Sequence, residues 1–145
     1  MIKCAMHGVV LGMLLAGPAI ALADDQDVID YRRHVMKTMG EEVASMRMII
    51  DRKAPADSFA AHARVLAITA TMAKKAFEPK VSGGDAKPEV WANWADFARR
   101  LDTLVTATDE LAKVAQSGGL TAAGPKVDEA LSCKACHDRY RVARK

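Results

Sequence analysis

Residues 88–119 read PEVWANWADFARRLDTLVTATDELAKVAQSGG, and this stretch indicates the fold class. Its large apolar residues recur at spacings of three and four, which is the period of one face of an α-helix. They are Trp91, Trp94, Phe97, Leu101, Leu104, Val105 and Leu111. Pro88 suits the first position of a helix, and Gly118-Gly119 suits its end. A helix with such a face must bury it, so we expect further helices to pack against it.

Three other segments carry helix signals. The first spans about 27–52, opens with acidic residues and stops before Pro55. The second spans about 57–77 with Asp57 as its expected N-cap, and it carries Phe59, Val65, Leu66, Ile68 and Met72. The fourth begins between Thr121 and Pro125 and runs on through the cysteines near the end of the chain. Four helices with short connections predict an all-α fold, an antiparallel up-and-down four-helix bundle.

The composition limits the classes of protein that the chain can be. Its 145 residues allow one domain of ordinary size, so a two-domain enzyme is excluded. The net charge is +3, from 21 basic and 18 acidic residues that alternate along the chain. Because no basic arm or acidic tail is present in the sequence, nucleic-acid binding is not expected.

The first 23 residues have the pattern of an export signal. Lys3 is the only charged residue before Asp24, residues 9–16 are apolar, and Ala21-Leu22-Ala23 offers the small residues of a cleavage site. We expect cleavage after Ala23, which leaves 24–145 as a four-helix domain. The alternative is an uncleaved membrane anchor, but the stretch barely reaches the roughly 20 apolar residues that span a bilayer. We therefore expect no membrane insertion after cleavage.

One motif carries chemistry. Cys133-Lys134-Ala135-Cys136-His137 has the C-x-x-C-H order of covalent haem attachment, in which two thiols add to the porphyrin vinyl groups and the imidazole reaches the iron. We expect one haem c on Cys133 and Cys136, with His137 as an axial ligand. Three alternatives compete: a thioredoxin-like redox pair, which needs a βαβ pattern; a zinc site, which needs two more ligands; and a Cys133–Cys136 disulfide in a bundle without haem.

The first helix decides what lies across the iron from His137. Its apolar residues follow spacings of three and four and share one face; they are Met36, Met39, Val43, Met46 and Ile50. Methionine commonly fills gaps in a core, so core packing is the default interpretation of each. Met36 and Met39 are also candidates for the haem pocket. His34 and His62 are expected to be solvated.

A cation lies on the same side of this helix. Arg32 precedes Met36 by four residues, and burying a guanidinium is costly unless it is paired. A haem propionate is a suitable partner for Arg32. The adjacent Tyr31 either adds a hydroxyl to this site or packs at the bundle end.

Three sequence features together resemble the class II cytochromes c, which include cytochrome c′ and the low-spin cytochrome c-556 group. They are Tyr31-Arg32-Arg33-x-x-Met36, Trp91 with Phe97, and the segment CKACHDRYR at 133–141. The resemblance implies a periplasmic four-helix bundle with covalent haem. It implies that Met36 holds the position of an iron-ligating methionine in the low-spin branch, where cytochrome c′ usually has an apolar residue and five-coordinate iron. It also implies that Arg32 lies near a propionate and Arg141 near the proximal histidine.

These observations predict a periplasmic one-electron carrier with low-spin iron between His137 and Met36, and not an enzyme. Its partners would be redox proteins of the periplasm, and a homodimer through the first two helices would be family-like. The alternative is a cytochrome c′-like protein that binds nitric oxide or carbon monoxide at five-coordinate iron. In that case Met36 belongs only to the core.

Overall fold

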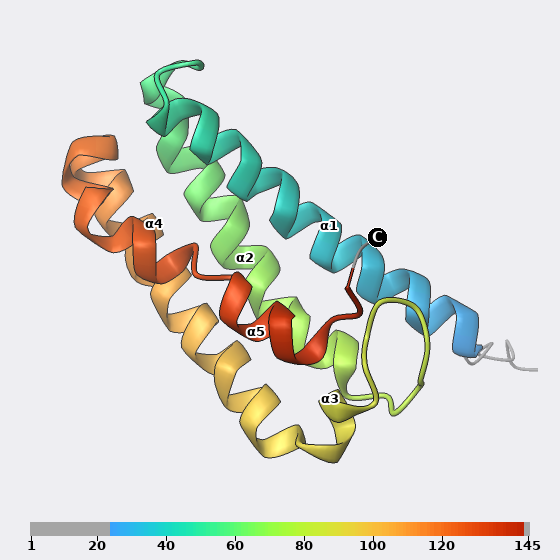
Figure 1. Ribbon diagram of the computed structural model, residues 1–145. Coiled ribbons are helices and arrows are strands. Elements are labelled where there is room, and N and C mark those ends of the chain that lie inside the picture. The colour runs from blue at the N-terminus through green and yellow to red at the C-terminus, as the bar shows by residue number, and fades with distance from the viewer. Residues whose placement is uncertain (1–23, 144–145) are drawn as a thin grey trace, which may run out of the picture.

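The computed structural model describes residues 24–143, so the export signal expected in 1–23 lies outside the described residues. The elements follow the chain as α1 (Asp25–Ile50), η1 (Ala56–Ser58), α2 (Phe59–Phe77), α3 (Glu89–Ala92), α4 (Trp94–Ala130) and α5 (Lys134–Tyr140). Between 24 and 143 no β-strand forms, apart from two isolated bridges. The prediction of an all-α fold is confirmed (Figure 1).

The beginning of α1 is set by a reciprocal pair of caps. The side chain of Asp24 accepts a hydrogen bond from the backbone N–H of Asp27 at 2.8 Å, and the Asp27 carboxylate accepts one from the Asp24 N–H at 3.3 Å. This capping box satisfies two N–H groups that the first helical turn leaves unpaired. The helix consequently begins at Asp25, two residues before the expected start.

Two antiparallel arms make up α4. Gly119 lies between them with φ 64° and ψ −160°, a conformation that favours glycine. The chain reverses there, and the second arm returns beside the first (Figure 1). Lys126 of the second arm pairs with Glu110 of the first at 2.6 Å. The two arms, α1 and α2 are therefore the four long helices of the bundle, and the expected boundary at Gly118-Gly119 is confirmed.

Three expected helix boundaries are wrong. The fourth helix does not continue into the cysteine motif, because α4 ends at Ala130 and a tight turn follows in which the Cys133 N–H bonds the Leu131 carbonyl at 2.8 Å. The third helix is interrupted at Asn93, with φ −121° and ψ 42°, which leaves α3 as a separate turn. Asp57 lies inside η1, so it does not cap α2.

The core lies where α2 packs against both α1 and α4. Its largest fully buried side chains are Phe59, Met46, Leu66, Leu111, Val90 and Thr108. On α1, Met39 and Met46 are buried and Met36 and Val43 are half-buried, as the period predicts. The prediction that Ile50 belongs to this buried face is wrong by one residue. Ile49 is 2% exposed, whereas Ile50 is 37% exposed.

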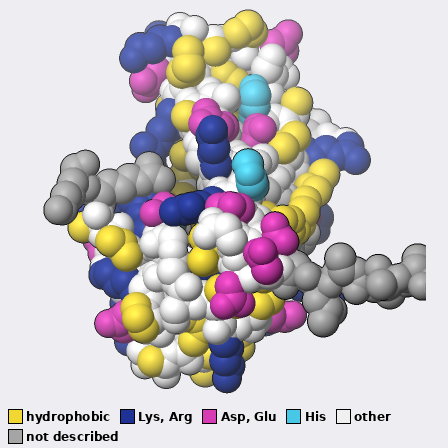
Figure 2. Space-filling model, turned by 90° about the vertical axis from the view of Figure 1, so that its right-hand side faces the viewer, with side chains coloured by type: hydrophobic (Ala, Val, Ile, Leu, Met, Phe, Trp, Pro, Cys, Tyr) yellow, Lys and Arg dark blue, Asp and Glu magenta, His cyan; other side chains and the backbone are white. Residues whose placement is uncertain are grey.

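The surface mixes both signs of charge with apolar side chains. Figure 2 shows basic and acidic groups interspersed over the face that it presents, which agrees with the alternation along the sequence. On α2, three apolar residues that the sequence placed in the helix are at least 40% exposed: Val65, Ile68 and Met72. Within 24–143, no helix has the length and hydropathy needed to cross a membrane.

Candidate haem-attachment site

The two thiols of the motif lie within one helical turn. Cys133 directly precedes α5, with helical φ −69° and ψ −27°, and Cys136 and His137 lie in its first turns. All three side chains are half-buried, and Cys136 packs against the core. Both thiols are free, so the disulfide of the haemless alternative is not formed here. Two free thiols three positions apart, followed by an imidazole, fit the attachment of a haem.

Burial raises the pKa of both thiols above the ordinary value. At Cys133 the charges of Arg47 and Arg141 partly oppose this rise, and at Cys136 the charge of Arg100 does so. The unreacted thiols are therefore protonated at neutral pH. Because Arg47 belongs to α1 and Arg100 to α4, the motif faces both helices.

Tyr140 fastens α5 to α4. It is 3% exposed, and its hydroxyl donates a hydrogen bond to the Asp96 carboxylate at 2.7 Å. The same carboxylate accepts a bond from Arg100 Nε at 2.7 Å and another from Arg99. The bond from Arg100, followed by that from Tyr140, lowers the pKa of Asp96 to about 2. Burial and this carboxylate together raise the pKa of Tyr140.

The segment between α2 and α3, here called the 81–87 loop, joins α1 to the end of α5. On one side Arg32 donates hydrogen bonds to the carbonyls of Val81 at 2.7 Å and Gly83 at 3.3 Å. On the other side the Lys87 N–H bonds the Tyr140 carbonyl at 3.0 Å, and the Val142 N–H bonds the Asp85 carbonyl at 2.9 Å. The loop thus ties two segments that are more than 100 positions apart in the sequence.

Arg32 is buried, as the sequence predicts, and the structure supplies its partners. The residue is 3% exposed, and its guanidinium lies 5.0 Å from the ring centre of Trp91 and 5.4 Å from that of Phe77. Burial, followed by the charge of Arg33, lowers its pKa. Two carbonyls and two aromatic rings account for this buried cation, so its burial does not require a haem propionate.

The other predicted site residues lie at different depths. Met36 is half-buried on α1, one turn after Arg32, and Met39 is 7% exposed. Tyr31 is 52% exposed, so its ring is not tightly packed at the bundle end.

Arg141 and His137 line one small cavity together. Its volume is about 170 Å³, and its other lining residues are Lys87, Asp138, Val142 and Ala143. Ligand pockets usually measure about 300–1,000 Å³, so this cavity alone does not enclose a haem. The cations of Lys87 and Arg141 nevertheless suit a carboxylate at this end of α5. Sequence reasoning missed Lys87, because only the fold brings it to the motif.

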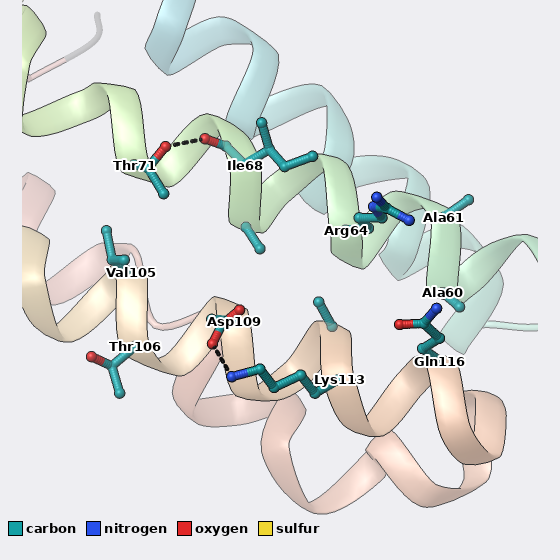
Figure 3. A pocket seen from close by; sticks show the side chains of 12 residues that line it. Ala60, Ala61, Arg64, Ile68, Thr71, Val105, Thr106, Asp109, Lys113 and Gln116 are labelled. Carbon is teal, nitrogen blue, oxygen red and sulfur yellow. Dashed lines mark hydrogen bonds and ion pairs between the residues drawn. The ribbon is translucent and has the colours of Figure 1, made fainter.

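A larger cavity lies away from the motif. It has a volume of about 680 Å³ and lies between α2 and α4, as Figure 3 shows. Alanines, Ile68 and Val105 form much of its wall, with Arg64 and Lys113 among the charged residues. Its lining contains neither a thiol nor an imidazole, so it is not the attachment site.

Two other histidines, His34 and His62, lie in the described part of the chain. His34 is exposed, as expected. The expectation of a solvated His62 is wrong, because its Nδ1 lies 2.7 Å from Oε2 of Glu42 and this pair joins α2 to α1. In the part of the chain that is described, no group of three or more His, Cys, Asp or Glu side chains is placed to hold a metal ion.

A four-helix bundle followed by a short helix that carries C-x-x-C-H defines a c-type haem protein. The family model described as Cytochrome C′ matches residues 27–141, and the chain belongs to this family. Its cofactor is covalently attached haem c, which the thiols of Cys133 and Cys136 fit.

Relatives of both branches match the chain. Cytochrome c′ of Alcaligenes xylosoxydans xylosoxydans is 31% identical over 122 residues, which cover 82% of this chain and 96% of the relative. Cytochrome c-556 of Agrobacterium tumefaciens (strain II Chrys) is 30% identical over 121 residues, which cover 79% and 96%. Solved nitric oxide and carbon monoxide complexes of cytochrome c prime variants from Alcaligenes xylosoxidans each align with a TM-score of 0.76 and 29% identity, covering 85% of this chain and 100% of their own.

Proposed function

We propose that the chain binds one haem c through Cys133 and Cys136, with His137 as axial ligand, and takes up nitric oxide or carbon monoxide at the opposite face of the iron. The observation that carries this proposal is the similarity over 85% of the chain to cytochromes c prime solved with those two gases. It therefore favours the gas-binding alternative over the electron carrier that the sequence led us to expect.

The haem, when bound, supplies the iron chemistry of gas binding and one-electron transfer. The chain's own residues hold and shield it. The two thiols fix its edge to α5, and the half-buried Met36 and buried Met39 of α1 offer apolar wall that excludes water. Arg32 holds the 81–87 loop to α1 through the Val81 carbonyl. In this role the protein binds a ligand and is not an enzyme.

A second candidate function is one-electron transfer with Met36 as the sixth iron ligand. It is favoured by a half-buried methionine one turn after the buried Arg32, and by the 30% identity to a cytochrome c-556. A thioether ligand favours ferrous iron and would exclude gases from the site. Its partners would be other redox proteins.

Optical spectra of the haem-loaded protein separate the two functions. Gas binding predicts a high-spin ferric spectrum and a ferrous spectrum that shifts when carbon monoxide is added. A low-spin ferric spectrum with a sulfur-to-iron charge-transfer band, unchanged by carbon monoxide, would refute it.

Two methionine variants assign the effect to one residue. If Met36 is a ligand, Met36→Ala removes the charge-transfer band and opens the iron to carbon monoxide; if it is pocket wall, the variant keeps the high-spin spectrum. Met48→Ala is the matched control, because Met48 lies on the same helix and is 51% exposed. Its spectrum should equal that of the parent protein.

We also propose that the chain is exported to the periplasm and cleaved after Ala23, which supports covalent haem attachment in that compartment. The apolar stretch at 9–16 and Ala21-Leu22-Ala23 support this proposal. The mass of the purified protein should equal that of a chain beginning at Asp24 plus one haem. A mass that includes the first 23 residues would contradict cleavage. Sedimentation of the same sample tests the homodimer.

A further inference from the structure

The haem-bearing helix α5 is held to the rest of the protein by few side-chain contacts. It is seven residues long, and its N-terminus receives no side-chain cap. Tyr140 is the one buried residue of α5. Lys134, Asp138 and Arg139 on the same helix are exposed. A short helix of this kind is held by its tertiary contacts and not by its own helix propensity.

The acceptor of the Tyr140 hydroxyl is itself held in place. Asp96 lies in the first turn of α4, and its side chain is 21% exposed. Arg100 and Arg99 of the same helix donate to its two carboxylate oxygens, while Tyr140 donates to Oδ2 at 2.7 Å. The phenol therefore binds a carboxylate whose orientation is set by two neighbours on its own helix. Arg139 of α5 also lies 3.7 Å from Oδ2 of Asp96, but its side chain is 51% exposed, so the buried phenol makes the stronger contact. A hydrogen bond to a charged acceptor is about twice as strong as one between neutral groups.

The ring of Tyr140 is anchored as well as its hydroxyl. It meets Phe97 edge to face, with ring centres 5.1 Å apart and planes at 77°. Phe97 in turn packs on Phe77 of α2 at 5.0 Å, and Phe77 lies beside the Arg32 guanidinium of α1. A continuous series of contacts thus connects α5 to the other side of the bundle.

We propose that Asp96 and Tyr140 are positioning residues that fix the rotation of α5 about its own axis and thereby the direction of the His137 imidazole toward the haem iron. This inference rests on the proposed coordination by His137. Tyr140 follows His137 by three positions, so the two side chains lie about 60° apart around the helix at 100° per residue. A rotation that moves the phenol away from Asp96 turns the imidazole by the same angle.

The backbone bonds of the 81–87 loop do not replace this function. The Lys87 N–H donates to the Tyr140 carbonyl at 3.0 Å, and the Lys87 ammonium donates to the Asp138 carbonyl at 3.1 Å, so both bonds restrain where α5 ends. These bonds all end on the backbone of the last turn of α5 or just after it, so they restrain the position of the helix end more than the rotation of the helix about its axis. The side-chain bond to Asp96 restrains that turn.

The test uses the haem-loaded full chain and two near-isosteric variants. Tyr140→Phe removes one oxygen atom and keeps the ring on Phe97, and Asp96→Asn removes the charge of the acceptor. Asp102→Asn is the matched control. Asp102 also lies on α4 and is 60% exposed, but it pairs with Lys74 of α2 at 2.9 Å and has no bond to α5.

Two measurements report on rotation and on anchoring. Resonance Raman spectra of the ferrous protein give the iron–histidine stretching band, which depends on the orientation of the imidazole. Amide hydrogen exchange reports how firmly α5 is held. We expect a shifted or broadened band in both variants, and exchange in α5 at least about tenfold faster, which corresponds to about 1.4 kcal/mol. Asp102→Asn should match the parent in both.

The outcomes separate this inference from the proposed function. A parent protein without covalent haem or without an iron–histidine band would overturn both. A parent with the band, and a Tyr140→Phe variant whose band is unchanged, would overturn the positioning role alone. Faster exchange in α5 with an unchanged band also overturns it, since Tyr140 then only stabilises the helix. If Asp96→Asn does not accumulate, Tyr140→Phe decides by itself.

Discussion

Replacing Arg32 by methionine tests whether this side chain anchors the 81–87 loop. The side chain is 3% exposed and donates to the Val81 carbonyl at 2.7 Å and to the Gly83 carbonyl at 3.3 Å. Methionine keeps the apolar stem and removes the charge, the donors and the stacking on Trp91 and Phe77. We expect the variant to fold, with a lower free energy of unfolding and a loosened loop.

The magnitude follows from these contacts. A hydrogen bond from a charged donor contributes about 1.5–3 kcal/mol, which applies to the short bond to Val81. The longer bond ends on the carbonyl of Gly83, which is exposed. In the variant, water can bind this carbonyl, so losing this bond costs little free energy. A desolvated cation over aromatic rings adds about 2 kcal/mol. Removing a buried charge also recovers part of its desolvation cost, so we expect a net loss of about 2–4 kcal/mol.

Urea unfolding of the haem-loaded protein, followed by circular dichroism, measures the loss. Arg33→Met is the control, because Arg33 is adjacent and half-exposed, and the one ion pair it forms among residues 24–143, with Asp30, contributes less than about 1 kcal/mol. Amide exchange at Lys87 and Val142, whose N–H groups bond Tyr140 and Asp85, reports on the loop itself. A loss below about 1 kcal/mol, or unchanged exchange at both amides, would refute the anchoring role.

Two further predictions concern glycines and acid. Gly84→Ala should lower the free energy of unfolding by at least about 1–2 kcal/mol, because φ is 62° and a Cβ would lie 2.9 Å from Ile29. Gly40 lies in α1 with open space around it, so Gly40→Ala should raise the free energy of unfolding by about 0.5–1 kcal/mol. Equal urea midpoints for the two variants would contradict both expectations. Because the folded pKa of Asp96 is lowered to about 2, its stabilising contribution is present above the ordinary pKa of 3.8 and is lost as pH falls toward 2. The stability difference between the parent and Asp96→Asn should therefore narrow below about pH 4, and a constant difference from pH 6 to pH 3 would contradict this.

The helical period predicted most of the bundle. Apolar spacings of three and four placed Met39 and Met46 in the core, and Gly118-Gly119 marked the reversal of the chain, because these signals act over one or two turns. The helical period predicted burial incorrectly at positions where burial depends on which neighbouring element packs against the helix. Ile49 replaces Ile50 in the core, and three apolar residues of α2 remain at least 40% exposed, because no element among residues 24–143 covers them.

The chemistry of attachment is also local in sequence. Cys133, Cys136 and His137 lie within five positions, so their order alone predicts a haem. The helix boundary before them was not predictable in this way. The break after Ala130 and the separate α5 depend on how the turn at 131–133 packs on the bundle.

The sequence by itself determined the fold class and the cofactor, because helical period and the C-x-x-C-H order are both short-range patterns. Only the tertiary structure decided the partners of the two polar groups that hold the site together. Arg32 meets the carbonyl of Val81 across 49 positions, and Tyr140 meets Asp96 across 44. Charge and burial predict that such groups need partners. Which partner each one finds depends on loop and helix placement that no local pattern encodes.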